Sequence, residues 1–133
     1  MDAVSSAHAA ALWVGLHIIL LLVLSVLVVR LRQKHKIALG DEGIPELARA
    51  IRAFGNATEY VPAGLVAIAV LALAGASPLS IHIVGLVLLT GRVTHAVGLS
   101  NSGGTSMPRA VGIILTWIAY VFAAAALLVY AIA

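Results

Sequence analysis

Five polar residues lie close together in this sequence, at the entrance to a long apolar run, and their types could bind a charged ligand. Arg49, Arg52, Asn56, Glu59 and Tyr60 all fall between positions 46 and 62. An α-helix turns by about 100° per residue, so residues three or four apart share a face. This spacing places all five within an arc of about a quarter turn. Charged groups on a helix that enters a membrane are costly unless they are paired or line a polar cavity. The spacing therefore predicts a polar site on this helix.

The other apolar runs also carry cations near one of their ends. Arg30 and Arg32 close the first run, Arg92 and His95 stand near the end of the third, and Arg109 begins the fourth. If the runs are helices packed side by side, each contributes a cation to one layer. Because cations outnumber carboxylates there, the pattern predicts a pocket for an anionic ligand.

Two simpler interpretations compete with a ligand pocket. Arginines at helix ends can extend to lipid head groups and do nothing else, which would account for Arg30 and Arg32. Glu59 lies deeper along its helix and could instead form a structural ion pair with Arg52 or with Arg92.

The composition defines a membrane protein. Of 133 residues, 62% are hydrophobic and only 10% are charged, whereas soluble domains average about 25% charged residues. The net charge of +3 is too small and too clustered to indicate nucleic-acid binding. With no cysteine, the chain has no disulfide and no thiol nucleophile of its own. Any thiol chemistry must therefore use a thiol brought by a ligand.

Four apolar segments predict a single all-α domain over residues 1–133, an integral membrane four-helix bundle. The first apolar run alone, 21 residues from Ala9 to Val29, is long enough to cross a hydrocarbon core of about 30 Å. The expected helices cover about 8–31, 45–75, 78–99 and 108–132.

The placement of Lys and Arg predicts the orientation in the membrane. The loop after the first helix is basic, and further cations lie at the end of the third helix and the start of the fourth, whereas both termini and the Gly75–Pro78 turn carry none. The excess of basic residues in cytoplasmic loops then places the basic end in the cytoplasm and both termini on the far side.

Two histidines stand alone on apolar faces and predict packing rather than a metal site. His17 and His82 are expected to form interhelical hydrogen bonds or simply to pack, and we predict no metal centre. Gly85 and Gly91 are expected to permit close helix packing.

Three motifs carry a family resemblance that spans essentially the whole chain. They are RAxxNxxExxP over residues 52–62, PELxR over 45–49 and RxxHAxG over 92–98. With the four-helix pattern, they resemble the membrane-associated proteins in eicosanoid and glutathione metabolism, and the chain is most similar to the short bacterial members. The resemblance implies an integral protein of a bacterial inner membrane that forms a homotrimer.

The resemblance also implies glutathione as the bound cofactor, held between neighbouring subunits near the cytoplasmic face. Arg52, Asn56, Glu59 and Tyr60 would hold it, with Glu59 at the α-amino group and arginines at the carboxylates. Arg49 and Arg92 would support that layer, and His95 would also belong to the glutathione site. The catalytic residues would be Arg109 and Arg30 or Arg32, which approach the thiol from the adjacent subunit.

The function implied is a glutathione-dependent transferase or peroxidase that uses a thiolate stabilised by Arg. The thiolate would conjugate or reduce hydrophobic small molecules that arrive through the membrane lipids. Leu99 stands where eicosanoid-synthesising members have Tyr, so synthesis of leukotrienes or prostaglandins is not implied. The alternative is a non-enzymatic membrane trimer that binds lipid head groups or a partner protein through the same Arg layer. A transporter subunit would need a continuous polar path, which the first and fourth helices do not offer.

Overall fold

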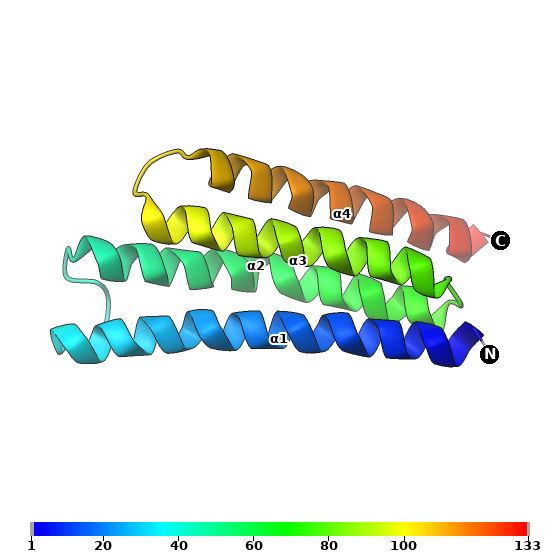
Figure 1. Ribbon diagram of the computed structural model, residues 1–133, viewed down its shortest axis with the longest axis horizontal. Coiled ribbons are helices and arrows are strands. Elements are labelled where there is room, and N and C mark those ends of the chain that lie inside the picture. The colour runs from blue at the N-terminus through cyan, green and yellow to red at the C-terminus, as the bar shows by residue number, and fades with distance from the viewer. Residues whose placement is uncertain (1, 133) are drawn as a thin grey trace.

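The computed structural model describes residues 2–132 as four long helices joined by short loops. These are α1 (Asp2–His35), α2 (Pro45–Leu73), α3 (Pro78–Asn101) and α4 (Met107–Ile132). Figure 1 shows α1 and α3 running in one direction and α2 and α4 in the other. Both α2 and α3 contact all the other helices, whereas α1 and α4 do not pack against each other within the described chain. The all-helical four-helix architecture expected from the sequence is confirmed.

The first helix is longer than its apolar run, which corrects the predicted bounds of 8–31. It has 34 residues, about 51 Å at 1.5 Å per residue, so it exceeds a hydrocarbon core of about 30 Å. Its last turn contains Arg32, Lys34 and His35. Cations there interact favourably with the negative end of the helix dipole, so the helix continues into the polar region. The other three helices begin and end within two residues of the expected positions.

Local signals in the sequence account for the helix ends around the α2–α3 turn. After α2, Gly75 adopts a positive φ of 83°, a conformation that glycine enters without steric cost. Ser77 then caps α3, and its hydroxyl accepts a hydrogen bond of 3.2 Å from the Ser80 amide. Pro78 occupies the first turn of α3, where its missing N–H leaves no helical bond unmade.

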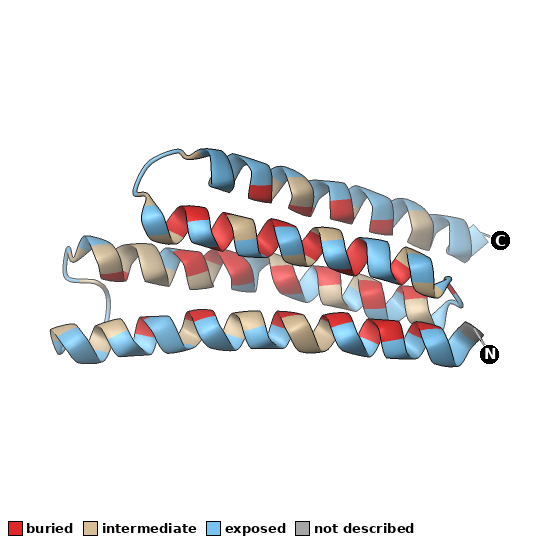
Figure 2. Cartoon of the chain, in the orientation of Figure 1, coloured by how far each residue is buried: buried red, intermediate tan, exposed pale blue. Residues whose placement is uncertain are grey.

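The outer faces of the helices are apolar and exposed, as expected of a protein in lipid. All four helices are long and apolar enough to cross a membrane. In Figure 2 the buried residues form stripes where the helices face one another, and the outward faces are exposed. Among the exposed side chains are Leu22, Val66, Leu86 and Val121. The chain is therefore an integral membrane protein.

The core at the end away from the basic loops packs around Trp13 of α1. Its ring occupies the space that a side chain on Gly85 of α3 would fill, and Ile81 and Leu88 are fully buried beside it. The indole Nε1–H donates to Nδ1 of His82 over 3.0 Å. The predicted role of Gly85 in close packing is confirmed.

Glycines also let α3 and α4 approach closely near the basic end. A Cβ on Gly91 would lie 2.9 Å from the carbonyl oxygen of Gly112, and a Cβ on Gly98 would lie 2.7 Å from the amide nitrogen of Arg109. Gly112 in turn faces the backbone of His95. These contacts confirm the predicted role of Gly91, and they fix Arg109 of α4 beside the last turns of α3.

We expect Gly112→Ala to destabilise the fold, because its methyl group would overlap the backbone of α3. Overpacking of this kind costs about 1–3 kcal/mol. The midpoint of thermal unfolding in detergent micelles should fall relative to the wild type. Gly15→Ala is the matched control, since nothing lies within 4 Å of its added methyl group. Equal midpoints for the two variants would contradict the close packing of α3 and α4.

Candidate functional site

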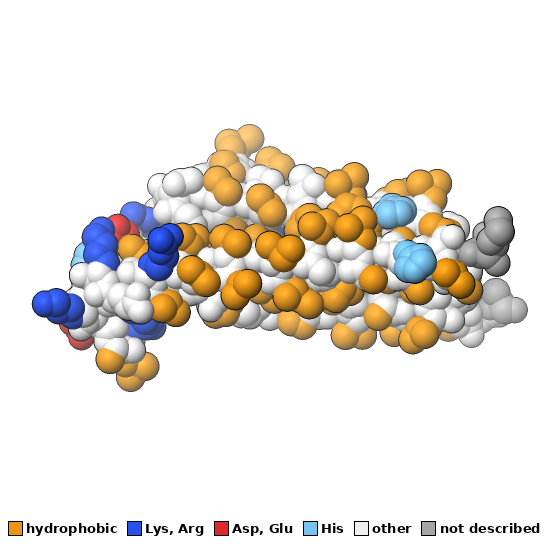
Figure 3. Space-filling view, turned by 60° about the horizontal axis from the view of Figure 1, so that its bottom comes forward, with side chains coloured by type: hydrophobic (Ala, Val, Ile, Leu, Met, Phe, Trp, Pro, Cys, Tyr) orange, Lys and Arg blue, Asp and Glu red, His pale blue; other side chains and the backbone are white. Residues whose placement is uncertain are grey.

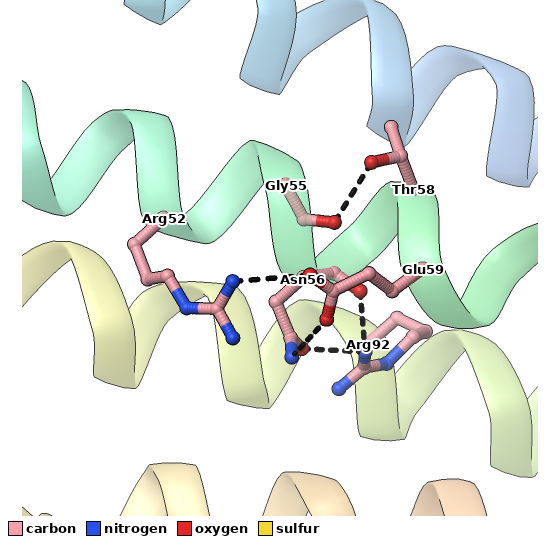
Figure 4. A network of polar contacts seen from close by, with 6 residues as sticks. All are labelled: Arg52, Gly55, Asn56, Thr58, Glu59 and Arg92. Carbon is pink, nitrogen blue, oxygen red and sulfur yellow. Dashed lines mark hydrogen bonds and ion pairs between the residues drawn. The ribbon is translucent and has the colours of Figure 1, made fainter. Parts of the chain in front are cut away.

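Three of the predicted residues of α2 form a connected polar group, which we call the α2 stripe: Arg52, Asn56 and Glu59. The guanidinium of Arg52 forms an ion pair with Glu59 at 3.0 Å, and Nδ2 of Asn56 lies 3.5 Å from the other carboxylate oxygen. Figure 4 shows the three side chains converging on Glu59. The one-face spacing read from the sequence therefore brings them together, and the Arg52 to Glu59 ion pair is formed within one chain.

Arg92 of α3 supports the stripe from inside the bundle. Its side chain is 1% exposed, and its Nη1 donates to Oδ1 of Asn56 over 2.9 Å and lies 3.4 Å from the Asn56 carbonyl oxygen (Figure 4). Because Oδ1 of Asn56 accepts from Arg92, the amide Nδ2 is turned toward Glu59. Arg92 thus positions Asn56, and burial keeps it away from any ligand on the outer face of α2.

Tyr60 links this buried cation to α4. The guanidinium of Arg92 lies 5.0 Å from the centre of the Tyr60 ring, within the range of a cation–π interaction. The Tyr120 hydroxyl of α4 donates to the Tyr60 carbonyl. The sequence analysis did not select Tyr120, because its hydroxyl contacts a backbone carbonyl and no sequence motif marks such a contact. Two nitrogens of Arg92, Nε and Nη2, are buried without a hydrogen-bond partner in the described chain.

The α2 stripe is exposed at a depth where exposure to lipid is costly. The side chains of Arg52 and Glu59 are 59% and 52% exposed. At about 1.5 Å per residue, Glu59 lies about 21 Å along α2 from Leu73. With the uncharged α2–α3 turn at one boundary of a hydrocarbon core about 30 Å thick, Glu59 falls inside that core. Charged groups at such depth normally face protein or a polar cavity. The stripe is therefore a surface that another molecule should cover.

A second group of polar residues lines a pocket where α3 ends and α4 begins, which we call the α3–α4 pocket. It has a volume of about 220 Å³ and is lined by His95, Thr105, Ser106, Arg109, Ala110 and Ile113. His95 is buried, and its Nδ1 is 2.8 Å from the carbonyl oxygen of Arg109. The Arg109 guanidinium donates to the Gly104 carbonyl. Two predicted site residues, His95 and Arg109, therefore belong to one pocket.

Ser106 is a further polar residue of this pocket that the sequence analysis did not select. Its Oγ is buried and has no hydrogen-bond partner among residues 2–132. A buried hydroxyl without a partner loses its hydration free energy, so it is normally satisfied by a water or a ligand. The sequence did not indicate a role for Ser106, because it lies in a Gly/Ser-rich loop and such loops contain many serines with no role.

The three remaining arginines form no hydrogen bond or ion pair with either group in the described chain. Arg49 donates to the Ser100 carbonyl at 3.1 Å and ties α2 to the end of α3. Arg32 donates to the Gly40 carbonyl at 2.9 Å in the α1–α2 loop, and Arg30 is exposed. No hydrogen bond or ion pair joins Arg30 or Arg32 to the α2 stripe in the part of the chain that is described. Figure 3 shows Lys and Arg side chains gathered at one end of the bundle, with hydrophobic side chains along its length.

The two lone histidines and Leu99 have structural contacts. His17 is fully buried, and its Nδ1 contacts the Trp13 carbonyl of its own helix at 2.7 Å. His82 of α3 forms an interhelical hydrogen bond of the kind expected, because it accepts from the indole N–H of Trp13 in α1. Leu99 is 5% exposed and packs in a small apolar cluster with Leu24 and Ala57, not in the α3–α4 pocket.

We expect Arg92→Met to destabilise the protein, because it leaves the buried Oδ1 of Asn56 without its donor. The loss of such a partner costs about 1–3 kcal/mol. Thermal unfolding in detergent micelles measures the effect, and Arg30→Met, at an exposed position, should change stability by less than about 0.5 kcal/mol. Equal unfolding midpoints for the two variants would mean that Arg92 does not hold the α2 stripe in place.

The fold and these groups define a four-helix integral membrane protein with a layer of arginines at one end. Residues 10–129 match the MAPEG family, and the chain belongs to that family. It is 42% identical over 92 residues to the "Inner membrane protein YecN" of Escherichia coli (strain K12), and the aligned region covers 69% of this chain and 70% of that protein. The protein of the same name from Escherichia coli O6:H1 matches to the same extent.

Proposed function

We propose that this protein is a membrane-bound glutathione transferase that conjugates hydrophobic electrophiles with a thiolate stabilised by Arg. The observation that carries the proposal is the α2 stripe, in which an exposed carboxylate and an exposed guanidinium stand side by side. Glutathione carries an ammonium group and two carboxylates, so Glu59 suits the ammonium group and Arg52 suits a carboxylate. The same thiolate would also serve for the reduction of a hydrophobic peroxide.

The chemistry requires a cation near the sulfur, and Arg109 is suited to that role. A free thiol has a pKa of about 8.5, and a nearby guanidinium lowers it by favouring the thiolate. Arg is preferable to Lys here because it remains charged at any physiological pH. The sulfur would then attack electrophiles that dissolve in the bilayer.

The proposal includes a homotrimer, in which a neighbouring copy covers the α2 stripe. Its support is the exposed ion pair at membrane depth, together with the family resemblance, which supplies the number three. In that arrangement Arg30 or Arg32 of one copy would approach the glutathione held by the next. That would give a role to two arginines that have no contact with the stripe of their own chain.

The proposal places the protein in a bacterial inner membrane with the basic end in the cytoplasm. The relative from Escherichia coli is named an inner membrane protein, and the described basic side chains gather at one end of the bundle (Figure 3). The excess of positive charge in cytoplasmic loops favours this orientation.

Binding of glutathione to the purified protein tests the proposal. Calorimetry in detergent should detect a complex, and light scattering should give the mass of a trimer. Ophthalmic acid, which has a methyl group in place of the thiol, is the matched ligand and should bind at the same stripe. Chromatography should then detect the conjugate formed from glutathione and 4-phenylbut-3-en-2-one. A folded wild-type protein that binds neither ligand would reject the proposal and favour a membrane protein that binds lipid head groups through its arginines.

A further inference from the structure

We infer that His95 accepts the proton of the glutathione thiol in the α3–α4 pocket. This inference rests on the proposed function and assigns a proton acceptor that the function does not itself require. It depends on three features of the pocket, which are the tautomer of His95, the position of Arg109 and the free hydroxyl of Ser106.

The hydrogen bond of His95 fixes which ring nitrogen can accept a proton. Nδ1 lies 2.8 Å from the carbonyl oxygen of Arg109. A carbonyl oxygen only accepts hydrogen bonds, so Nδ1 carries the hydrogen. In the neutral ring, Nε2 is then an acceptor. His95 lines the pocket, and Nε2 is the ring nitrogen left to accept a proton from a group bound there.

The same contact brings His95 together with the arginine assigned to the sulfur. Arg109 provides the carbonyl that accepts from the imidazole, and Arg109 also lines the pocket, with its guanidinium donating to the Gly104 carbonyl. Gly98 and Gly112 allow this approach, since neither has a side chain to hold α3 and α4 apart. A sulfur bound in this pocket would therefore lie among residues that include both His95 and Arg109.

Ser106 provides a further polar atom at the pocket. Its Oγ is buried and has no partner in the described chain, and it lines the pocket with His95 and Arg109. A hydroxyl can donate to a thiolate, so a bound sulfur would satisfy it. Thus one group can accept the proton, while the guanidinium and the hydroxyl stabilise the charge left behind.

The reaction balances with an electrophile that has a carbon–carbon double bond conjugated to a carbonyl. The S–H bond breaks, its electron pair stays on sulfur, and the proton moves to Nε2 of His95. The thiolate forms an S–C bond to the β-carbon, and the electrons of the double bond move to give an enolate. Nε2 then returns the proton to the α-carbon, which leaves the ring neutral and the adduct complete. No oxidant or second reactant is needed.

In the described chain, the charged groups whose field acts on His95 are three guanidiniums. They belong to Arg92 on the same helix, Arg52 on α2 and Arg109 on α4. Their positive field is a feature of both the wild type and any variant at His95, so a change in the pH profile of that variant reports the ring itself.

His95→Asn tests the inference, because Nδ2 of Asn can replace Nδ1 as donor to the Arg109 carbonyl while the acceptor at Nε2 is lost. General bases contribute about 100- to 10,000-fold to a rate, so kcat for addition of glutathione to 4-phenylbut-3-en-2-one at pH 7 should fall at least about 100-fold. The Kd of glutathione should stay within about a factor of two, since a group that acts on the chemical step changes kcat rather than binding.

The pH profile separates a lost base from a structural defect. Without a base the thiol must ionise unaided, so the rate of His95→Asn should rise about tenfold per pH unit until the pH reaches the pKa of the bound thiol, which Arg109 holds below the value of about 8.5 for a free thiol. The deficit should therefore shrink by pH 9. His82→Asn is the matched control, because its Oδ1 can still accept from Trp13, and it should retain the wild-type profile.

The outcomes distinguish this inference from the proposed function. A wild type that forms the conjugate, with His95→Asn keeping the same kcat and pH profile, would overturn the role of His95 alone. A deficit in His95→Asn that is equal at pH 7 and pH 9 would also overturn it, because it would indicate damaged packing. A wild type that binds no glutathione would reject the proposed function and this inference together.

Discussion

Arg109→Ala is expected to lower kcat for glutathione conjugation by about 100- to 1,000-fold, the usual effect of removing one group that stabilises a developing anion. The guanidinium lines the α3–α4 pocket with His95 and Ser106, and its only hydrogen bond in the described chain is to the Gly104 carbonyl. A guanidinium has five N–H donors, so one bond to a carbonyl leaves others for a bound thiolate. Steady-state rates with 4-phenylbut-3-en-2-one at saturating glutathione measure the loss.

Two variants make the result specific. Arg109→Lys keeps the positive charge but loses the planar guanidinium with its several N–H donors, so it should retain part of the activity. Lys34→Ala removes a cation from the same end of the bundle, where it pairs with Glu46 at 2.8 Å, and should leave kcat unchanged. The oligomer mass of all variants should match that of the wild type. Full activity in Arg109→Ala would show that another group holds the thiolate.

Glu59→Gln should weaken glutathione binding by roughly 10- to 150-fold, which corresponds to the 1.5–3 kcal/mol of a hydrogen bond to a charged group. The carboxylate is half-exposed and already forms an ion pair with Arg52. A ligand ammonium group can share it without first removing it from a buried site. The amide of Gln keeps the shape of the side chain but not the charge. Calorimetric titration of the detergent-purified variant gives the change in Kd.

Arg52→Ala and Thr58→Val complete this test. Arg52→Ala removes the partner proposed for a ligand carboxylate and should weaken binding by a similar factor. Thr58 lies on the same helix, and its hydroxyl donates to the Gly55 carbonyl and to no other group of the described chain (Figure 4). Thr58→Val should therefore bind glutathione as the wild type does. Unchanged affinity for glutathione in Glu59→Gln would mean that the α2 stripe is not part of the glutathione-binding site.

The sequence was sufficient to predict the helices, because in a membrane protein the length of each apolar run decides them. It failed at the ends of α1, which extends to His35 beyond the last apolar residue. Hydropathy alone does not predict that a helix continues beyond its last apolar residue. A helix that has already formed continues into a polar region as long as no residue stops it, and none of the residues between 30 and 35 is Gly or Pro.

The α2 stripe was predictable for a similar reason. Its residues belong to one helix, so the helical repeat alone places them together. The burial of Arg92 was harder to predict from the sequence, because it depends on how α3 packs against α2 and on the side-chain oxygen of Asn56, which accepts its hydrogen bond.

The α3–α4 pocket could not be predicted from spacing. His95 and Arg109 are separated by a loop of irregular conformation, and their contact depends on glycines at the helix interface. Sequence analysis grouped His95 with the residues that hold glutathione and Arg109 with the adjacent subunit. Within one chain, His95 contacts the backbone carbonyl of Arg109, and the approach of Arg109 to the thiol of an adjacent subunit stays a prediction. The position of Leu99 in an apolar cluster could not be predicted either, since α3 contains apolar residues on every side.

The even number of membrane crossings has a practical consequence for studying cooperation between sites. Asp2 and Ile132 lie at the same end of the bundle (Figure 1), so the last helix of one copy can be joined to the first helix of another by a Gly/Ser linker that never crosses the bilayer. A linker of about 16 residues would span roughly 20–24 Å on average. Such tandem chains would allow an assembly with one altered protomer at a chosen position. Its turnover, compared with that of the unmixed assembly, would reveal whether each protomer works alone.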